Sequence, residues 1–471
     1  MTSEFKAGKA LAELGPDDLL RLFSHPGQRE TFHHIEALIG TLRNCETPQQ
    51  FFEFQQELFG HAMRVGERRA HCTRIARRLR KGRPLPVDAP EPPPIGDVVD
   101  ATTWEFEVLV LERLSRQFRA VGDGLAWCLF AYDRRKILAL SQNDSPGPII
   151  KEKGKLNDPT TGLSHELGAV IEIWSERGNF ALLHDLTNCL RIADLTEFGP
   201  DGHQGLHEVK RNPKNKSSTQ TRRMQDAIRA ATGDGPLPGK PRSGVVDLLE
   251  PYRTNLAQLS DVIGLARRHG SRGMKLSNGR AIIASSLLGL AERYGDDHEA
   301  AIRAMQSTRQ SAIRRAGIAN STHHINGRSA DFAARSNIAV PWAIYPLSPT
   351  DCAALICDFI SFETIISVDV LTDLLRAEGL MVEVLLPRAH GHLTMRQNVM
   401  RVTNKRQEIT IRPMSTGALL YELLDPVSWV GGIAELLDRS GVPAEPLVRY
   451  ANDFQPWWPL PRPLQELMTD P

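Results

Sequence analysis

The sequence predicts a protein of the mixed α/β (α+β) class with three regions. The first 82 residues carry helix formers and no strand-like alternation, which predicts a helical N-terminal region. Residues 98–240 alternate amphipathic helical patterns with short apolar runs of strand length, which predicts a mixed central domain. Residues 241–471 contain Asn278-Gly279 between two apolar runs, a pattern typical of a β-hairpin, and are expected to form an α/β region of unknown role.

The composition is that of a soluble globular protein, because 41% of the 471 residues are hydrophobic and 24% are charged. The formal net charge is +1, so any attraction to a polyanion must come from local clusters. No apolar run approaches the ~20 residues that span a bilayer, and the N-terminus lacks the pattern of a secretory signal. Six scattered cysteines without a CxxC pair favour buried thiols. We therefore expect a cytoplasmic protein without a membrane partner.

The N-terminal region is predicted to end at a linker. Residues 51–63, FFEFQQELFGHAM, and the arginine-rich stretch after them favour helix. Residues 83–97 contain six prolines, which exclude helix and most sheet. A second Pro/Gly-rich segment, residues 233–244, is expected to end the central domain.

The central domain is predicted to contain both helices and strands. Asp100 is a plausible N-cap for an amphipathic helix over 100–118. Apolar periodicity predicts further helices over 161–174 and 217–231. Short apolar runs predict strands over 126–132, 136–140, 179–186, 190–195 and 205–210.

The C-terminal region is predicted to begin with a helix over 250–268, followed by the hairpin over 273–285. Strands are expected over 381–386, 397–402 and 408–412. No motif assigns this region a task, so substrate binding, homo-oligomerisation and binding of a partner protein all remain open.

Asp194, Glu208 and Lys210 are the residues whose pattern points most clearly to chemistry. Asp194 is predicted to end a strand, and the turn-forming residues 199–202 lead back into a strand with Glu208 and Lys210 on one face and Val209 on the other. Hydrolysis of a phosphodiester needs an activated water and relief of negative charge, which Mg²⁺ held by one or two carboxylates can supply. A nearby lysine can orient the water or stabilise the oxyanion.

The predicted helices on either side add polar residues. Glu166 lies on or beside an apolar stripe formed by Leu163, Leu167, Val170, Ile171 and Trp174, where a carboxylate is costly unless it is paired or bound to metal. Glu172 is expected to face solvent. In the helix over 217–231, Gln220 shares a face with Met224, Ala227 and Ile228, and Gln225 lies on its flank. Basic residues that a phosphate backbone could contact are Arg211, Lys214, Lys216, Arg222 and Arg223.

Over residues 160–232, this pattern resembles the PD-(D/E)XK nuclease superfamily, although Ala193 replaces the proline of the named pattern. The resemblance implies a restriction-endonuclease-like core, with a mixed sheet flanked by helices, and Mg²⁺ as cofactor, with Mn²⁺ able to substitute. Asp194, Glu208, Glu166 and the Val209 carbonyl would hold the metal, and Lys210 would position the attacking water. Gln220 or Gln225 would orient the site. The implied activity is hydrolysis of nucleic acid, with DNA as the expected substrate, in phage defence, restriction or mobile-element processing.

The arginine-rich stretch over 64–83 contains nine Arg or Lys residues and one acid. Arg74, Arg77 and Arg78 are candidates for contact with a nucleic-acid backbone. The alternative is a solvated helix whose charges are balanced by acids elsewhere.

Other motifs give weaker signals. His323-His324 and His390-Gly391-His392 lack the spacing of a closed zinc site, and residues 233–241 lack the glycine spacing of a phosphate loop. The alternative to a nuclease is a catalytically inactive nucleic-acid-binding or scaffold subunit of a larger assembly, in which Glu208 and Lys210 form an ordinary cross-strand pair.

Overall fold

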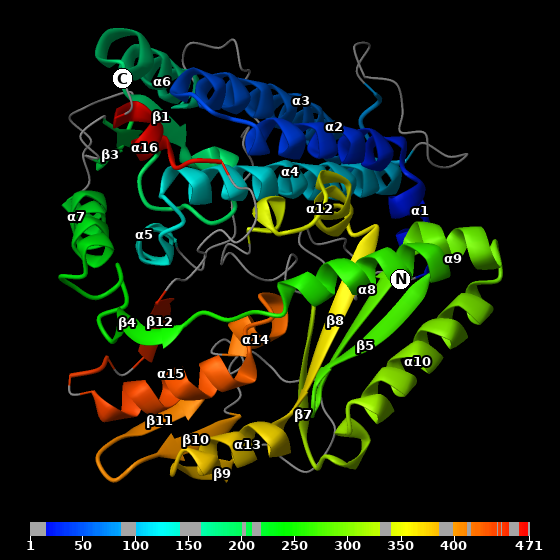
Figure 1. Ribbon diagram of the computed structural model, residues 1–471. Coiled ribbons are helices and arrows are strands. Elements are labelled where there is room, and N and C mark those ends of the chain that lie inside the picture. The colour runs from blue at the N-terminus through cyan, green and yellow to red at the C-terminus, as the bar shows by residue number, and fades with distance from the viewer. Residues whose placement is uncertain are drawn as a thin grey trace. The chain divides into compact units, whose positions relative to one another are not determined.

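The computed structural model shows a mixed α+β protein with several small sheets (Figure 1). The chain is divided into two compact units. Unit 1 comprises Met1–Thr232, Ala334–Ile344 and Pro459–Pro471, and unit 2 comprises Gly233–Ala333 and Tyr345–Trp458. The structure describes residues 16–85, 100–141, 162–199, 204–209, 218–329, 341–385, 399–411, 416–439, 441–443, 445–451 and 461–469.

Unit 1 begins with four helices, of which α2, α3 and α4 lie side by side (Figure 1). They are α1 (Pro16–Ser24), α2 (Pro26–Arg43), α3 (Pro48–Arg80) and α4 (Ala101–Leu129), and the short α16 (Leu464–Thr469) packs against α3 and α4. Thr47 and Gln50 form a capping box at the start of α3, and the Asp100 carboxylate accepts a hydrogen bond from the Thr103 amide at the start of α4. The predictions of a helical N-terminal region and of Asp100 as an N-cap are confirmed.

Two predicted strands are helical instead. The run over 126–132 contains the last turn of α4, and the run over 136–140 lies in α5 (Arg134–Leu140). Trp127, Cys128 and Leu129 are all buried, so this part of α4 has no polar face for the sequence to reveal. A short run that is apolar on every side does not distinguish a buried strand from a buried helix.

The second half of unit 1 holds a small antiparallel sheet between two helices in sequence. The chain runs through α6 (Gly162–Arg177), β1 (Phe180–Leu183), the 3-10 turn η2 (His184–Leu186), β2 (Leu195–Phe198), β3 (Gln204–His207) and α7 (Ser218–Thr232). The strand order is β1-β2-β3, with Leu195 opposite both Leu183 and His207. Helix, three strands and helix is the order that the sequence predicts.

The predicted second strand, over 190–195, is wrong in its position. Residues 187–194 form a loop, and β2 begins at Leu195, directly after Asp194. Ala193 has a left-handed backbone conformation, with φ of 68°, which ordinary strands do not adopt. The amides of Asn188 and Cys189 donate to the Asp123 carboxylate on α4 instead of to a strand.

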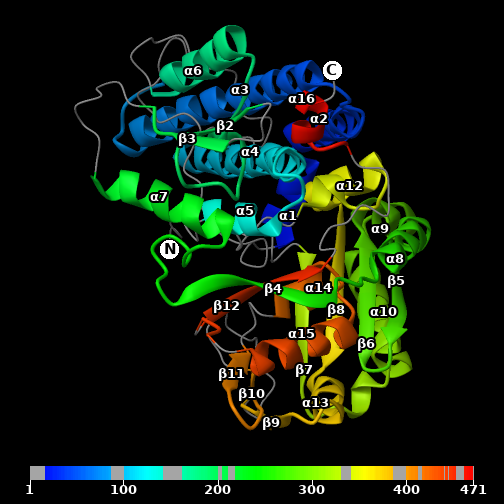
Figure 2. The same ribbon diagram turned by 60° about the vertical axis from the view of Figure 1, so that its left-hand side comes forward.

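Unit 2 contains a four-stranded antiparallel sheet in the order β5-β6-β8-β7, flanked by helices (Figure 2). Its strands are β5 (Ser271–Ser277), β6 (Arg280–Ser286), β7 (His324–Arg328) and β8 (Ile360–Ser367), and its neighbouring helices are α8 (Leu256–His269), α9 (Leu287–Tyr294), α10 (His298–Arg315) and α12 (Pro349–Ile356). The Asn278-Gly279 hairpin is confirmed as the β5–β6 connection. Gly279 has φ of 71°, and a Cβ there would lie 2.4 Å from Val370, so both backbone and space require glycine.

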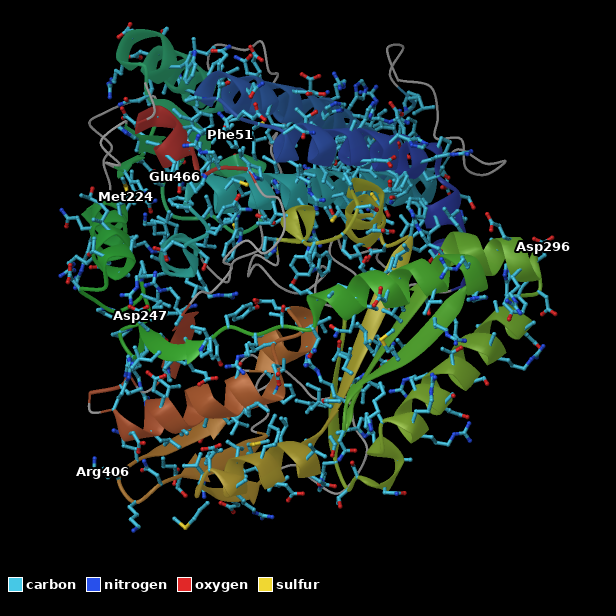
Figure 3. All side chains as sticks on the ribbon, in the orientation of Figure 1. Phe51, Met224, Asp247, Asp296, Arg406 and Glu466 are labelled. Carbon is cyan, nitrogen blue, oxygen red and sulfur yellow. The ribbon has the colours of Figure 1, made fainter. Side chains whose placement is uncertain are left out.

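The rest of unit 2 packs around a second core. This part contains β4 (Ser243–Pro251), α13 (Val368–Ala377), β9 (Met381–Val384), β10 (Met400–Thr403), β11 (Glu408–Ile411), α14 (Gly417–Tyr421), α15 (Pro426–Asp438) and β12 (Glu445–Ala451). The strands over 381–384, 400–403 and 408–411 confirm three predicted strands. The predicted helix over 250–268 is correct only from Leu256, because residues up to Pro251 pair with β12 as the strand β4. In Figure 3, Arg406 lies at the β10–β11 turn and Asp296 at the connection from α9 to α10.

Within the described parts of the chain, no helix combines the length and apolar character needed to cross a membrane.

Candidate active site

Asp194 is held against the segment that carries Glu208. Its backbone N–H donates to the His207 carbonyl at 2.9 Å, and its carboxylate Oδ2 accepts from the Val209 N–H at 2.7 Å. Its own carbonyl accepts from the His184 amide at 2.9 Å. Asp194 therefore contacts the residues on both sides of Glu208, although 14 positions of sequence separate the two acids.

The loop before Asp194 is positioned by α4. The Asp123 carboxylate accepts from the Asn188 and Cys189 amides at 2.7 and 3.0 Å. Gly122, the neighbouring residue on α4, allows the helix to approach this loop, because a Cβ there would lie only 1.8 Å from the Leu186 carbonyl oxygen. Burial raises the pKa of Asp123, although the hydrogen bonds from Cys189 and Asn188 oppose this shift.

Glu208 follows β3 directly and is half-buried, with its Oε2 oxygen inaccessible to solvent. Because β3 ends at His207, the prediction that a regular strand runs on through Glu208 is not supported in the described part. Val209 is half-buried and uses its amide to bind Asp194. Lys210 lies outside the described residues.

Glu166 is on the inward side of α6. It lies four residues before Val170 and seven before Ile173, which are both buried, so all three share one face. The two-residue connection from Arg177 to Phe180 makes α6 run antiparallel to β1, against which it packs. The N-terminal part of α6, with Glu166, therefore extends toward the end of the sheet where β1 ends and Asp194 precedes β2.

The predicted stripe on α6 needs one correction. Ile171, which was expected to face the core, is 47% exposed, and Ile173 is buried in its place. Glu172 is exposed, as expected. The helix carries more apolar residues than one face can bury. The sequence pattern therefore fits two buried faces that are slightly rotated about the helix axis, one with Ile171 and one with Ile173.

The predicted glutamines lie on α7, which packs against another helix. Helix α7, which carries Met224 (Figure 3), packs on α5. Gln220 is half-buried and lies seven residues before the buried Ala227, whereas Gln225 is exposed. Ile228, which was predicted on the same face as Gln220, is 46% exposed. Among the described residues, no hydrogen bond joins either glutamine to Asp194.

The predicted basic residues divide into several groups. Arg222 is exposed and Arg223 is half-buried on α7. Arg211, Lys214 and Lys216 lie outside the described residues. Arg74, Arg77 and Arg78 are exposed on α3.

The basic stretch of α3 is partly neutralised by α4. Arg68 contacts Glu107 at 2.8 Å, Arg69 donates to Glu112 at 3.0 Å, and Arg80 pairs with Glu105. The alternative of a charge-balanced helix is therefore correct for these arginines. Arg74 lies outside this set of pairs and is the clearest remaining candidate for contact with a phosphate backbone.

A polar network beside the site was not predicted. Glu197 on β2 contacts His207 at 2.7 Å and Arg177 at 3.2 Å, and it accepts from the Asn179 amide at 2.7 Å. Burial alone would raise the pKa of Glu197, but the hydrogen bond from Asn179 and the charges of His207 and Arg177 lower it overall. Glu197 and His207 lie on the same face of the β2–β3 pair. Strand alternation would have predicted their contact if the start of β2 had been predicted correctly.

The candidate metal ligands in the described residues are few. In the part of the chain that the structure describes, no three His, Cys, Asp or Glu side chains gather closely enough to hold a metal. Mg²⁺ commonly takes one or two protein carboxylates and retains several waters. Asp194 and Glu208 supply two carboxylates, on segments that the hydrogen bond from the Val209 amide to Asp194 joins.

Comparison with known proteins gives no match: no protein-family model, no curated protein and no solved structure matches this chain.

Proposed function

We propose that this protein is a metal-dependent nuclease that hydrolyses phosphodiester bonds, with DNA as substrate. The observation that carries the proposal is the hydrogen bond between the Asp194 carboxylate and the Val209 backbone amide, which ties Asp194 to the residue that follows Glu208. In the proposed site the two carboxylates would repel each other, and a bound cation would relieve that repulsion. The element order α6-β1-β2-β3-α7 and the inward position of Glu166 support a restriction-endonuclease-like core.

In this proposal, Asp194 and Glu208 hold Mg²⁺ or Mn²⁺, with the Val209 carbonyl and Glu166 completing or tuning the shell. The metal, when bound, neutralises phosphate charge and lowers the pKa of a bound water. Lys210 orients that water and stabilises the oxyanion. Gln220 or Gln225 orients the site or the substrate.

Substrate binding is assigned to basic residues. On α3 these are the exposed Arg74, Arg77 and Arg78, and on α7 they are the exposed Arg222 and the half-buried Arg223. Arg211, Lys214 and Lys216, which lie outside the described residues, complete the proposed set. The six cysteines are all buried free thiols, which supports a cytoplasmic location. We also propose that the protein acts in phage defence, restriction or mobile-element processing. Its C-terminal region would form an oligomer or bind a partner protein.

A plasmid-nicking assay tests the proposal. Purified protein with Mg²⁺ or Mn²⁺ should relax and linearise supercoiled DNA, and EDTA should stop the reaction. Glu208→Gln and Lys210→Ala should abolish cleavage while thermal unfolding stays unchanged. Glu172→Gln removes an exposed carboxylate from α6 and serves as the matched control. Equal cleavage by Glu208→Gln, Lys210→Ala and wild-type protein would overturn the assignment.

One observation favours the second candidate, a catalytically inactive nucleic-acid-binding or scaffold subunit. The Asp194 carboxylate already accepts a backbone hydrogen bond, so it has a structural role that needs no metal. An inactive subunit would bind DNA in the presence or absence of Mg²⁺ and leave the plasmid supercoiled at every metal concentration. Metal-dependent cleavage that is lost in Glu208→Gln excludes this candidate.

A further inference from the structure

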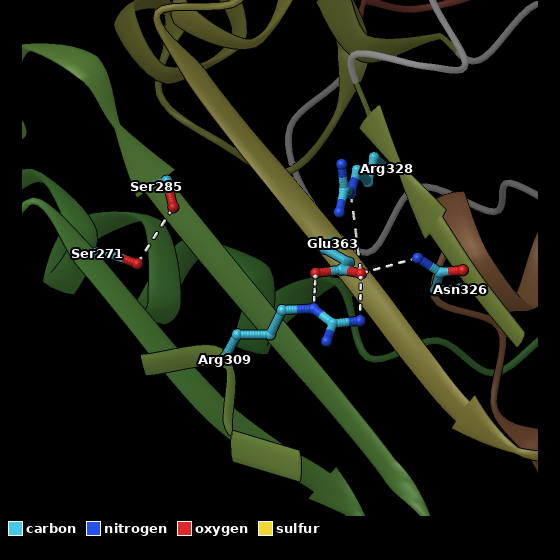
Figure 4. Close-up of polar contacts among 6 residues, drawn as sticks. All are labelled: Ser271, Ser285, Arg309, Asn326, Arg328 and Glu363. Carbon is cyan, nitrogen blue, oxygen red and sulfur yellow. Dashed lines mark hydrogen bonds and ion pairs between the residues drawn. The ribbon is translucent and has the colours of Figure 1, made fainter. Parts of the chain in front are cut away.

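In unit 2, the buried Glu363 carboxylate contacts two arginines and a side-chain amide on one face of the sheet β5-β6-β8-β7 (Figure 4). Glu363 on β8 accepts from Arg309 Nε at 2.8 Å and from Arg309 Nη2 at 3.1 Å. The Asn326 side-chain amide donates to Glu363 at 2.8 Å, and Arg328 Nε lies 3.9 Å from it. Arg309 comes from α10, whereas Asn326 and Arg328 come from β7.

Strand register explains why these groups meet. Arg328 is directly opposite Glu363 in the β7–β8 ladder, and Asn326 lies two residues away on the same face. The same face carries Ala281, Ile283 and Ile365, which pack with Ala312 of α10. Helix α10 covers β5 and β6 there, while Asn326 and Arg328 on β7 remain exposed.

The cluster holds more positive charge than its structural role requires. Arg309 alone forms a two-bond ion pair with Glu363, which suffices to tie α10 to the sheet. Burial alone would raise the pKa of Glu363, but the hydrogen bonds and charges around it lower the pKa overall, so the carboxylate is ionised. Arg328 is a second cation facing this single charge, its side chain is 49% exposed, and it has no closer acidic partner among the described residues.

The neighbouring helix reinforces the excess. Helix α10 contains four arginines and one acid, Glu299, which pairs with Arg303 at 3.0 Å. Arg314 and Arg315 are exposed near its C-terminus. Because the whole chain has a formal net charge of only +1, this is a local concentration of positive charge.

We propose that the surface formed by Arg309, Asn326 and Arg328, with the exposed arginines of α10, binds the phosphate groups of a nucleic-acid backbone. A guanidinium held by a carboxylate on one edge can present its remaining N–H groups to a phosphate without losing further side-chain freedom. The amide of Asn326, fixed by Glu363, faces the same side of the sheet. This inference deepens the proposed function, and it rests on that function only for the identity of the ligand.

The test is a binding titration in EDTA, so that cleavage does not enter. A fluorescently labelled DNA duplex of about 25 base pairs is titrated with the full-length protein at several salt concentrations. Arg328→Glu should weaken binding on the order of tenfold and reduce the slope of log affinity against log salt by about 1 or more. Arg376→Glu on α13 makes the same change in net charge at an arginine that is 59% exposed, and should retain wild-type affinity and slope.

Each outcome decides the inference. Wild-type binding that falls in Arg328→Glu and not in Arg376→Glu supports it. Equal affinities in the two variants, or no binding of the DNA duplex by the wild-type protein, would overturn it. Plasmid cleavage by the same variants separates this inference from the proposed function. If the wild-type protein cleaves DNA and Arg328→Glu binds DNA as tightly as the wild-type protein does, only the proposed binding surface is wrong. If Arg328→Glu weakens binding but the wild-type protein does not cleave DNA, only the nuclease assignment is wrong.

Discussion

The Asp194 carboxylate accepts a hydrogen bond from the Val209 backbone amide at 2.7 Å, which joins the loop before β2 to the segment after β3. This bond gives Asp194 two roles, because the same side chain that fixes the backbone is proposed to bind metal. The two roles can be separated by substitution, since an amide oxygen can accept a hydrogen bond but carries no charge.

Asp194→Asn should keep the fold and lose cleavage by about 100-fold or more, because the bond to Val209 persists while the charge that attracts Mg²⁺ is gone. Asp194→Ala should also unfold more easily, by about 1–2 kcal/mol, because it leaves the Val209 amide without its partner. Plasmid cleavage and urea unfolding measure the two effects. Equal cleavage by Asp194→Asn and wild-type protein would remove Asp194 from the active site.

Gly122→Ala should destabilise unit 1 by about 3 kcal/mol, because the new Cβ would lie 1.8 Å from the Leu186 carbonyl oxygen and force α4 away from the loop before Asp194. Gly168→Ala, in the interior of α6, is the control. No atom lies within 4 Å of the Cβ it would add, so helix propensity should stabilise the protein by about 0.5–1 kcal/mol. Thermal unfolding of the two variants should shift in opposite directions, and a shared direction would contradict the packing described here.

Gln55→Leu should cost about 3 kcal/mol. The buried Gln55 side chain on α3 donates to the Ala181 carbonyl at 2.8 Å and accepts from the Leu183 amide at 3.1 Å, so it satisfies two backbone groups of β1. Gln49→Leu, at an exposed position of the same helix, should change stability by less than about 0.5 kcal/mol. Chemical denaturation compares them, and similar midpoints would show that β1 does not depend on Gln55.

Glu107 should make stability depend on pH in the acid range. Burial alone would raise the pKa of Glu107, but the hydrogen bond from His25 at 2.9 Å and the charge of Arg68 lower it below the ordinary value of 4.5. The unfolded chain therefore binds a proton more readily than the folded chain. The contribution of Glu107 is fully present above pH 4.5 and is lost as the pH falls through the folded pKa.

Unfolding free energies measured between about pH 3 and 6 should thus rise more steeply for wild-type protein than for Glu107→Gln. Glu57→Gln, which removes an exposed carboxylate from α3, is the matched control and should keep the wild-type slope. Parallel curves for wild-type protein and Glu107→Gln would show that this buried carboxylate is not linked to folding.

The features that the sequence predicts correctly depend on short-range signals. Asp100 caps α4 through a bond to Thr103, only three residues away, and Asn278-Gly279 closes a hairpin between adjacent strands. By contrast, the end of α4 around Trp127 was predicted as a strand because burial on every side removes the helical period from the sequence.

The candidate site shows the same limit. The pairing of Asp194 with the Glu208 segment agrees with the spacing in the sequence, but the start of β2 does not. That start depends on Asp123 and Gly122, which lie on a helix more than 60 residues earlier in the chain. Long-range contacts of this kind leave no periodic pattern near Asp194, so the loop over 187–194 could not be distinguished from a strand.

A titration with Mn²⁺ tests most directly whether Asp194 and Glu208 hold a metal. Binding is measured as the loss of the sharp electron paramagnetic resonance signal of the aqueous ion. Wild-type protein and Glu172→Gln should bind the ion with equal affinity in the absence of DNA. Asp194→Asn and Glu208→Gln should each lose that binding while remaining folded. Equal Mn²⁺ affinity in all four proteins, or no binding by the wild-type protein, would contradict a metal centre at these two residues.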